Sequence, residues 1–178
     1  MGEIHRVKKG LNLPIIGEPQ QKIEQGRQVR SVALVGFDYT NMKPTMKVKE
    51  GDHVKLGQPL FEDKRTPGVT YTAPASGTVR AVNRGKRRVF QSLVIDVGGG
   101  DAVKFKNYHG KGTDNLSYEE VRDLLLESGQ WTALRRRPFS KVANPEERPN
   151  ALFITPMDTN PLTAKAEVVI GERKEDFE

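Results

Sequence analysis

Two neighbouring stretches decide the fold of this chain: residues 48–64, VKEGDHVKLGQPLFEDK, and residues 72–79, TAPASGTV. Each consists of short apolar segments separated by glycine or proline, and the same pattern extends from residue 43 to residue 97. The turn-forming residues recur about every eight positions, at Gly51, Gly57, Pro67-Gly68, Pro74, Gly77 and Gly85. Short strands with turns at this spacing predict an all-β barrel or sandwich.

Longer apolar runs mark the two ends of this β region. Residues 29–37 (VRSVALVGF) predict a buried strand, and residues 89–97 (VFQSLVIDV) predict the last strand of the module. The glycines at 98–100 could hold a phosphate only if a helix began directly after them. Residues 102–105 (AVKF) instead indicate another strand, so we interpret the glycines as a turn.

The hydrophobic period changes to that of a helix beyond residue 116. Ser117 and Glu120 have the spacing of a capping box, Val121 and Leu124–Leu126 supply an apolar stripe, and Gly129 stands where a helix commonly ends. The apolar run at 151–155 (ALFIT) then predicts a buried strand.

Asn160-Pro161 predicts the start of a second helix. A helix, a buried strand and another helix are the opening of an α/β unit, which needs several parallel strands to bury its faces. We therefore expect a truncated Rossmann-like α/β domain, and a chain that is the N-terminal piece of a longer protein.

The composition excludes several classes of function. The net charge is +6, but the basic residues are spread along the chain, and the clusters at 84–88 and 135–137 are not interleaved with aromatic residues as in a nucleic-acid platform. We interpret the basic residues as a solvated face or a docking surface, and we expect no nucleic-acid partner.

The absence of cysteine excludes disulfides, zinc–thiolate sites and cysteine-ligated iron–sulfur clusters in this chain. No signal peptide or membrane-spanning run is evident, so we expect a soluble protein that is not exported.

The β region resembles the biotinyl and lipoyl carrier domains, which present a modified lysine on a tight hairpin. Glu62-Asp63-Lys64 is similar to the lipoyl motif, and the segment at 73–77 (APASG) follows as it does in that family. Residues 65–68 (RTPG) lengthen and stiffen the turn, however, and no methionine flanks Lys64. We therefore expect the barrel-sandwich hybrid fold without the modification, and a native mass with no adduct on Lys64.

These patterns predict an α+β chain in three parts. Residues 1–28 form a polar N-terminal segment, residues 29–108 the biotinyl/lipoyl-like barrel-sandwich hybrid domain, and residues 109–178 the truncated beginning of the Rossmann-like domain.

A more specific resemblance runs from about residue 7 to the end of the chain. The segments that carry it are VKKGLNLP (7–14), PTMKV (44–48), FEDK (61–64), PGV (67–69), TAPASG (72–77), NRG (83–85), LLESG (125–129), WTAL (131–134), RPFSK (137–141) and MDTNPL (157–162). Together, in this order, they resemble the A subunit of the bacterial sodium-translocating NADH:quinone oxidoreductase.

The resemblance implies a peripheral subunit on the cytoplasmic face of the bacterial inner membrane. It would dock on integral-membrane and other subunits of a redox pump, at the end where electrons pass to ubiquinone or menaquinone. It implies no covalent flavin and no iron–sulfur cluster in this chain, and a full-length subunit more than twice as long. The family is related to the flavin-binding subunit of complex I, but the glycine-rich loop that a flavin phosphate would need is missing here.

Two stretches offer aromatic rings with hydrogen-bond donors, as a quinone head group requires. The candidate quinone contacts are Phe37, Tyr39, Met42, Trp131, Arg137, Phe139 and Lys141. For each stretch the alternative is structural: a ring at the end of a strand or helix is often a core residue, and a neighbouring cation often contacts solvent or a partner.

The basic run Arg135, Arg136 and Arg137 is a candidate docking strip for an acidic partner or an anionic membrane. His5, His53 and His109 are too scattered for a metal site, and we expect no metal and no catalytic residue in this chain.

Two other functions stay open. One is the C subunit of the related ferredoxin:NAD oxidoreductase pump, which shares this architecture and adds cysteine-ligated clusters beyond the present segment. The other, of a different class, is a free-standing biotin or lipoyl carrier domain.

Overall fold

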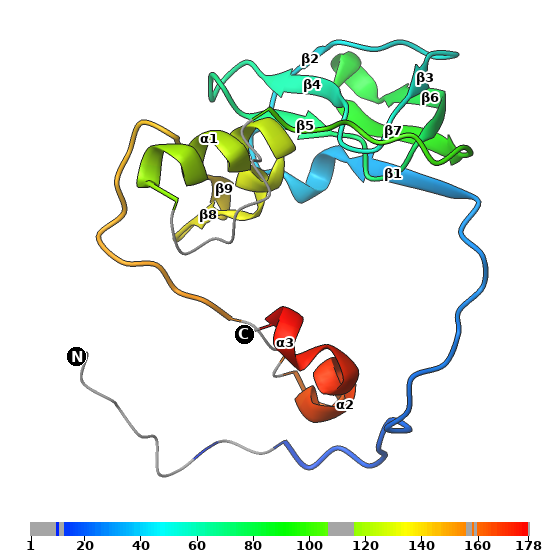
Figure 1. The fold of residues 1–178 in the computed structure, drawn as a ribbon, viewed down its shortest axis with the longest axis vertical. Helices are drawn as coiled ribbons and strands as arrows, with labels where there is room; N and C mark the ends of the chain where they lie inside the picture. The colour runs from blue at the N-terminus through cyan, green and yellow to red at the C-terminus, as the bar shows by residue number, and fades with distance from the viewer. Residues whose placement is uncertain (1–9, 11–12, 107–115, 156–157, 159, 178) are drawn as a thin grey trace. The chain divides into compact units, whose positions relative to one another are not determined.

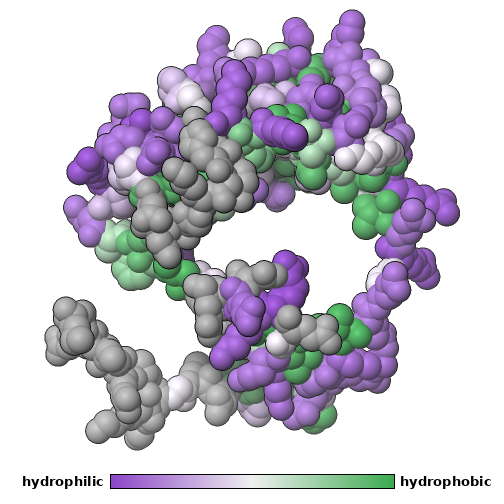
Figure 2. Space-filling view, viewed as in Figure 1, coloured by the Kyte–Doolittle hydropathy of each residue, from purple (hydrophilic) through white to green (hydrophobic). Residues whose placement is uncertain are grey.

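The computed structural model describes residue 10 and residues 13–106, 116–155, 158 and 160–177 (Figure 1). The chain divides into two compact units: residues 28–149, and the two chain ends, residues 1–27 with 150–178. The larger unit, residues 28–149, contains the sheets and the buried core. Hydrophilic side chains cover most of its visible face (Figure 2).

Among the described residues, the strands of the larger unit pair into three sheets in which every neighbour is antiparallel. The four-stranded sheet has the order β1 (Ser31–Val35), β7 (Phe90–Val97), β6 (Gly77–Arg84) and β3 (His53–Val54). The three-stranded sheet has the order β2 (Pro44–Met46), β4 (Pro59–Asp63) and β5 (Thr70–Thr72). A small hairpin pairs β8 (Arg135–Arg136) with β9 (Lys141–Val142). Short strands at turn-separated intervals confirm the predicted β module.

Both larger sheets contribute buried apolar side chains to the core, and the Phe61 ring of β4 contacts the Phe90 ring of β7. In β7, Phe90, Leu93 and Ile95 are buried, and in β4 Leu60 and Phe61 are buried. Burying each such side chain stabilises the fold by about 1.5–3 kcal/mol. The remaining buried apolar residues of this cluster are Val54, Val69, Tyr71, Ala73, Val79, Trp131 and Val142.

The first strand differs from its prediction. β1 begins at Ser31 and pairs only with β7, at the edge of the four-stranded sheet. Val32 and Leu34 are half-buried against the core, while Ser31, Ala33 and Val35 are exposed. An edge strand with one face on the core buries only alternate side chains, so the continuous apolar run does not make β1 a fully buried strand.

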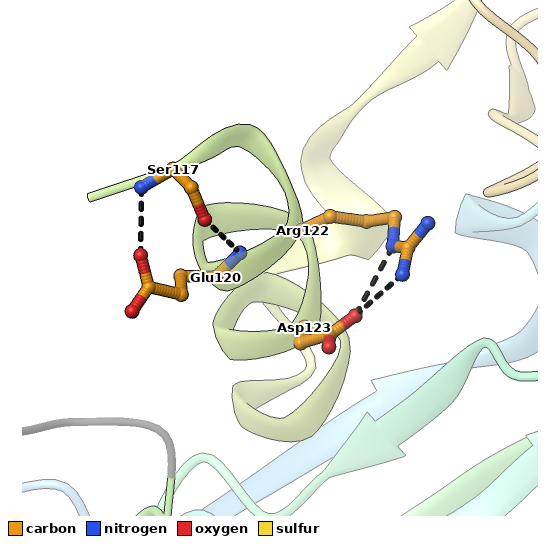
Figure 3. Close-up of polar contacts among 4 residues, drawn as sticks. All are labelled: Ser117, Glu120, Arg122 and Asp123. Carbon is orange, nitrogen blue, oxygen red and sulfur yellow. Dashed lines mark hydrogen bonds and ion pairs between the residues drawn. The ribbon is translucent and has the colours of Figure 1, made fainter.

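The helix α1 (Tyr118–Ser128) confirms the sequence prediction at both ends. Ser117 accepts a hydrogen bond from the Glu120 backbone N–H at 3.3 Å, and Glu120 accepts one from the Ser117 backbone N–H at 2.8 Å (Figure 3). Arg122 and Asp123 form an ion pair of 3.0 Å on the same helix (Figure 3). Gly129 ends the helix in the left-handed conformation, as predicted.

Helix α1 continues into the 3₁₀ helix η4 (Gln130–Ala133), and both contact β5. The β8–β9 hairpin follows and contacts η4 through β9. In Figure 1, α1 and this hairpin lie beside β5 in the larger unit. The short 3₁₀ helix η1 (Gly36–Asp38) follows β1. A second one, η2 (Lys86–Arg88), lies between β6 and β7.

Two predicted strands are absent from the described structure. At residues 102–105, only Ala102 forms a bridge, with Leu56, and the following residues are not in a strand. Residues 151–155 are extended but form no β-ladder, and the side chain of Phe153 is 86% exposed. A strand requires a hydrogen-bonded partner, and none of the described residues pairs with this apolar run.

The smaller unit contains short helices near the end of the chain: α2 (Ala166–Ile170), the 3₁₀ helix η5 (Gly171–Arg173) and α3 (Lys174–Phe177). The predicted start at Asn160-Pro161 is wrong, because the helix begins at Ala166 after Lys165. Asn160 is used in a local turn, where its backbone N–H donates to the Asp158 carboxylate at 3.0 Å. Within the part of the chain described here, no helix is long and apolar enough to span a bilayer.

Candidate functional site

The turn between β4 and β5 is fixed by the buried carboxylate of Asp63. Its Oδ1 atom accepts hydrogen bonds from the backbone N–H groups of Lys43 at 3.0 Å and Arg65 at 2.9 Å. The Arg65 guanidinium in turn donates to the Asn41 carbonyl at 3.3 Å. Lys64 is exposed and donates its backbone N–H to the Lys43 carbonyl at 2.8 Å. The Glu-Asp-Lys sequence therefore serves here to close a turn against the loop before β2.

A cluster of aromatic rings lies behind this turn. The rings of Phe61 and Tyr71 are stacked with their centroids 4.7 Å apart, and Tyr39 meets Tyr71 edge-on at 4.7 Å. Phe90 contacts Phe61 at 5.2 Å. The Arg135 guanidinium lies 4.8 Å from the centroid of the Tyr39 ring, a cation–π distance. The cluster thus joins β4, β5 and β7 to the β8–β9 hairpin.

A pocket of about 210 Å³ opens where the β4–β5 turn, the loop at residues 40–42 and the segment 136–144 meet. Its charged lining residues are Asp63, Arg65, Arg136 and Lys141. Its uncharged polar lining residues are Thr40, Asn41, Thr66 and Asn144. Met42, Pro67, Tyr71 and Val142 complete the lining. Polar residues therefore predominate, and cations outnumber the single carboxylate among them.

Tyr71 has a hydroxyl group that the structure leaves unpaired. The residue is 2% exposed, and among the described residues its hydroxyl oxygen is the buried side-chain polar atom for which no hydrogen-bond partner is found. Burial raises the pKa of Tyr71 well above the ordinary 10.0, and the charge of Asp63 raises it further. Burial also raises the pKa of Tyr39, while the charge of Arg135 opposes that effect. Both phenols are therefore neutral near pH 7.

Trp131, a candidate quinone contact, is instead part of the core. It is 6% exposed, and its indole Nε1–H donates to the Ala143 carbonyl at 2.8 Å. This bond ties η4 to the residue that follows β9. The Thr72 hydroxyl donates to the Ser128 carbonyl at 2.9 Å, so β5 holds the end of α1 in the same way.

The structure brings together only some of the other predicted contacts. Met42 and Lys141 line the pocket, and Tyr39 packs against Tyr71 beside it. Phe37 is 83% exposed and Phe139 is 70% exposed, each outside the pocket lining. Arg137 is exposed and precedes the cis peptide bond to Pro138.

The three arginines of the predicted docking strip occupy different environments. Arg135 lies over Tyr39 and donates to the Ser140 carbonyl at 3.5 Å. Arg136 forms an ion pair with Glu147 at 2.9 Å. Arg137 lies in the turn between β8 and β9, where its side chain is open to solvent. Of the three, Arg137 is the one for which the structure gives no competing contact among the described residues.

The sequence pattern did not identify Tyr71 or Asp63 as site residues. Tyr71 lies between two threonines in an alternating strand, a pattern that predicts burial but not an unpaired hydroxyl. His53 is exposed, with its Nε2 atom 3.6 Å from Asp101 Oδ2, and His5 and His109 lie outside the described residues. Among the residues that the structure describes, no cluster of His, Cys, Asp or Glu is placed to hold a metal ion.

Comparison with known proteins assigns both parts of the chain to one family. Residues 5–98 match the family model of the NqrA N-terminal barrel-sandwich hybrid domain, and residues 116–178 match that of the NqrA second alpha/beta domain. The chain belongs to the NqrA family. The resemblance read from the sequence, and the predicted barrel-sandwich hybrid followed by an α/β domain, are thereby confirmed.

Curated relatives of the NqrA family agree. The chain is 56% identical to the A subunit of the Na(+)-translocating NADH-quinone reductase of Pseudomonas aeruginosa, over 97% of this chain and 39% of that protein. It is 56% identical to the protein of the same name from Hahella chejuensis and 55% identical to that of Neisseria meningitidis, each over 97% of the chain and 38% of the relative. The chain thus spans about two fifths of the length of these relatives.

The boundary predicted at residue 108 stays a prediction. The family model of the second domain begins at residue 116, whereas α1 and the β8–β9 hairpin lie in the same compact unit as the barrel, residues 28–149. The family match favours membership of the NqrA family over the C subunit of the ferredoxin-linked pump and over a free-standing carrier domain.

Proposed function

We propose that this chain is the N-terminal part of a peripheral subunit of a sodium-translocating, membrane-bound NADH:quinone oxidoreductase. The observation that carries the proposal is the match to both NqrA domain models, in the order the family has them. The relatives carry that activity in their names. The chain serves in this complex as an assembly and quinone-handling element, not as an independent enzyme.

The larger unit suits an assembly role. Its core is built from antiparallel sheets, α1 is capped at both ends and bonded to β5 at its C-terminal end, and the aromatic cluster joins the β8–β9 hairpin to the barrel. A scaffold held in this way can present exposed turns to the integral-membrane and other subunits without rearranging. The proposed location is the cytoplasmic face of the bacterial inner membrane.

Quinone handling is proposed for the accessible members of the predicted set. A quinone head group offers a flat ring and two carbonyl acceptors, so it requires an aromatic or aliphatic face and one or two donors. Phe37 and Phe139 present exposed rings, Met42 a polarizable side chain, and Arg137 and Lys141 cationic donors. Tyr39 and Trp131, which pack within the larger unit, complete the predicted set. The substrate is ubiquinone or menaquinone, and we expect neither a covalent flavin nor an iron–sulfur cluster in this chain.

The test is photo-crosslinking of a quinone analogue in the assembled complex, followed by peptide mapping. We expect labelled peptides that include residues 36–42 or 137–141, and loss of the label when excess unlabelled quinone is added. Phe139→Ala in the assembled complex should reduce labelling of the second peptide, and Phe153→Ala is the matched control because Phe153 is also an exposed phenylalanine. Labels confined to other subunits would remove quinone handling from this chain and leave the assembly role.

A further inference from the structure

We propose that the pocket beside Tyr71 binds a small oxyanion of the phosphate or carboxylate class. Met42 and Lys141 also belong to the proposed quinone-handling set, but this proposal rests on the pocket and its donors and not on the exposed rings of Phe37 and Phe139.

The first argument is the supply of donors around one small volume. Arg65, Arg136 and Lys141 line the pocket, and Asn144 and Thr66 add an amide and a hydroxyl group. An oxyanion has several acceptor oxygens and carries negative charge, so it can use many donors at once, and Arg pairs with such groups through its planar fork.

The second argument is the Tyr71 hydroxyl. A buried hydroxyl without a partner costs free energy, and natural structures contain few of them. The hydroxyl belongs to a residue that lines the pocket, and its ring is held between Phe61 and Tyr39 by the contacts described above. The hydroxyl oxygen itself is closed to solvent, so a small shift of the lining side chains is needed before a ligand oxygen in the pocket can supply the missing acceptor.

The charge balance also favours an anion. The carboxylate of Asp63 already accepts two backbone N–H groups, so part of its charge is stabilised by the β4–β5 turn. Arg136 is partly neutralised by Glu147, whereas Arg65 and Lys141 are exposed cations. The lining therefore keeps a net positive charge beside Asp63, which a single small anion can offset.

The volume and lining fit an oxyanion better than a quinone ring. Ligand pockets for larger molecules run from about 300 to 1,000 Å³ and are predominantly apolar. This pocket has about 210 Å³, and only Met42, Pro67 and Val142 among its lining residues are aliphatic or thioether side chains.

The experiment is calorimetric titration of the 178-residue chain at pH 7 and constant ionic strength. Inorganic phosphate and succinate are titrated separately, which distinguishes the two sources of oxyanion, with chloride as the reference salt. We expect saturable heat with at least one of them. Tyr71→Phe keeps the ring stack and removes only the hydroxyl, and it should weaken binding about tenfold, as the loss of a hydrogen bond to a charged group does. Lys141→Gln should weaken it similarly.

Matched controls separate this effect from general charge. Tyr118→Phe changes an exposed tyrosine and Lys55→Gln an exposed lysine, both outside the pocket lining, so both should keep the original affinity. The proposal is wrong if neither anion binds saturably, or if Lys55→Gln weakens binding as much as Lys141→Gln does. It is also wrong if a short-chain quinone, and no oxyanion, binds in a manner that Tyr71→Phe abolishes. That last result would leave quinone handling intact and place it in this pocket.

Discussion

At the scale of single residues, Trp131 stabilises the larger unit through both its ring and its indole N–H. The ring is buried in the core, and the N–H donates to the Ala143 carbonyl. Trp131→Phe should lower the free energy of unfolding by about 2 kcal/mol, because it removes a buried hydrogen bond and part of the packed volume. Trp131 is the only tryptophan of the chain, so the variant has no tryptophan fluorescence to follow. Urea unfolding is therefore followed by far-UV circular dichroism, which reports on both proteins. An unchanged midpoint would show that the indole is not a structural element, and would return it to the set of accessible candidates.

Tyr71 should make the stability of the fold depend on alkaline pH. Burial raises its pKa above 10.0, so below pH 10 the hydroxyl is neutral in both the folded and the unfolded chain. Above pH 10 the unfolded chain loses this proton and the folded chain keeps it, so the free energy of unfolding falls as pH rises, by up to about 1.4 kcal/mol per pH unit.

Urea unfolding of the wild type and of Tyr71→Phe at pH 8, 10 and 11 tests this dependence. The variant should lose less stability between pH 10 and 11 than the wild type does. At pH 8 it should be as stable or more stable, because it lacks an unpaired buried hydroxyl. Parallel curves for the two proteins would contradict the burial of that hydroxyl.

At the scale of elements, the junction between α1 and β5 depends on the absence of a side chain at Gly129. Its φ angle is +77°, and a Cβ atom there would lie 2.5 Å from the Thr72 hydroxyl oxygen, which itself donates to Ser128. Gly129→Ala should therefore cost more than the roughly 1 kcal/mol of left-handed strain, and we expect a loss of about 3 kcal/mol.

Gly51→Ala is the matched control for this junction. Gly51 has a φ angle of +88° and open space around the position of a Cβ atom, so only the strain remains. The difference between the two variants in denaturant unfolding isolates the contact with Thr72. Equal losses would mean that α1 shifts on β5 at little cost.

Docking through the basic strip stays a prediction, and Arg137 is its most direct test because Arg135 and Arg136 have contacts within the larger unit. If Arg137 faces an acidic surface, Arg137→Ser should weaken attachment of the chain to its membrane partners in the assembled complex about fivefold. One cation near such a surface contributes about 1 kcal/mol to binding, which corresponds to that factor. The melting temperature should hardly change, since the side chain is exposed. The fraction of the chain that stays attached to its membrane partners is measured at low and moderate salt, with Lys55→Ser as the control. A drop in melting temperature with unchanged retention would make Arg137 a structural residue.

Local signals explain which elements could be predicted from the sequence. The capping box and Gly129 encode both ends of α1 within a few residues, so the helix was predictable. The β8–β9 hairpin has two-residue strands and no alternating pattern, so no periodicity could reveal it. The run at 151–155 has the composition of a buried strand, but pairing depends on partners that composition does not specify.

The candidate site was harder to predict than the fold, because it also depends on which segments pack together and not on local signals alone. Tyr39, Met42 and Lys141 were named from the sequence, yet Trp131, named with them, is buried among core residues. Aromatic residues beside cations occur both in cores and in binding sites, and only the fold separates the two. Tyr71 and Asp63 lie on the local β4–β5 hairpin, but the pocket forms only where residues 40–42 and 136–144 reach that hairpin, a long-range arrangement that no motif contains.

At the scale of the whole molecule, the buried core cluster extends from Val54 to Val142, and the apolar residues packed against it from Val32 to Ala143. All of these residues lie within the larger unit, residues 28–149. A chain of residues 28–149 should therefore fold on its own and melt cooperatively within about 3 °C of the 178-residue chain, since one kcal/mol shifts the midpoint of a domain of this size by about 4 °C. Differential scanning calorimetry measures the midpoints.

A chain of residues 28–115 is the matched control. It lacks Trp131 and Val142 from the core and the hydrogen bond that holds α1 to β5. It should therefore melt at a distinctly lower temperature, or without cooperativity. If the 28–149 chain melts as low as the shorter one, segments outside the larger unit contribute to its stability, and the unit is not an autonomous domain.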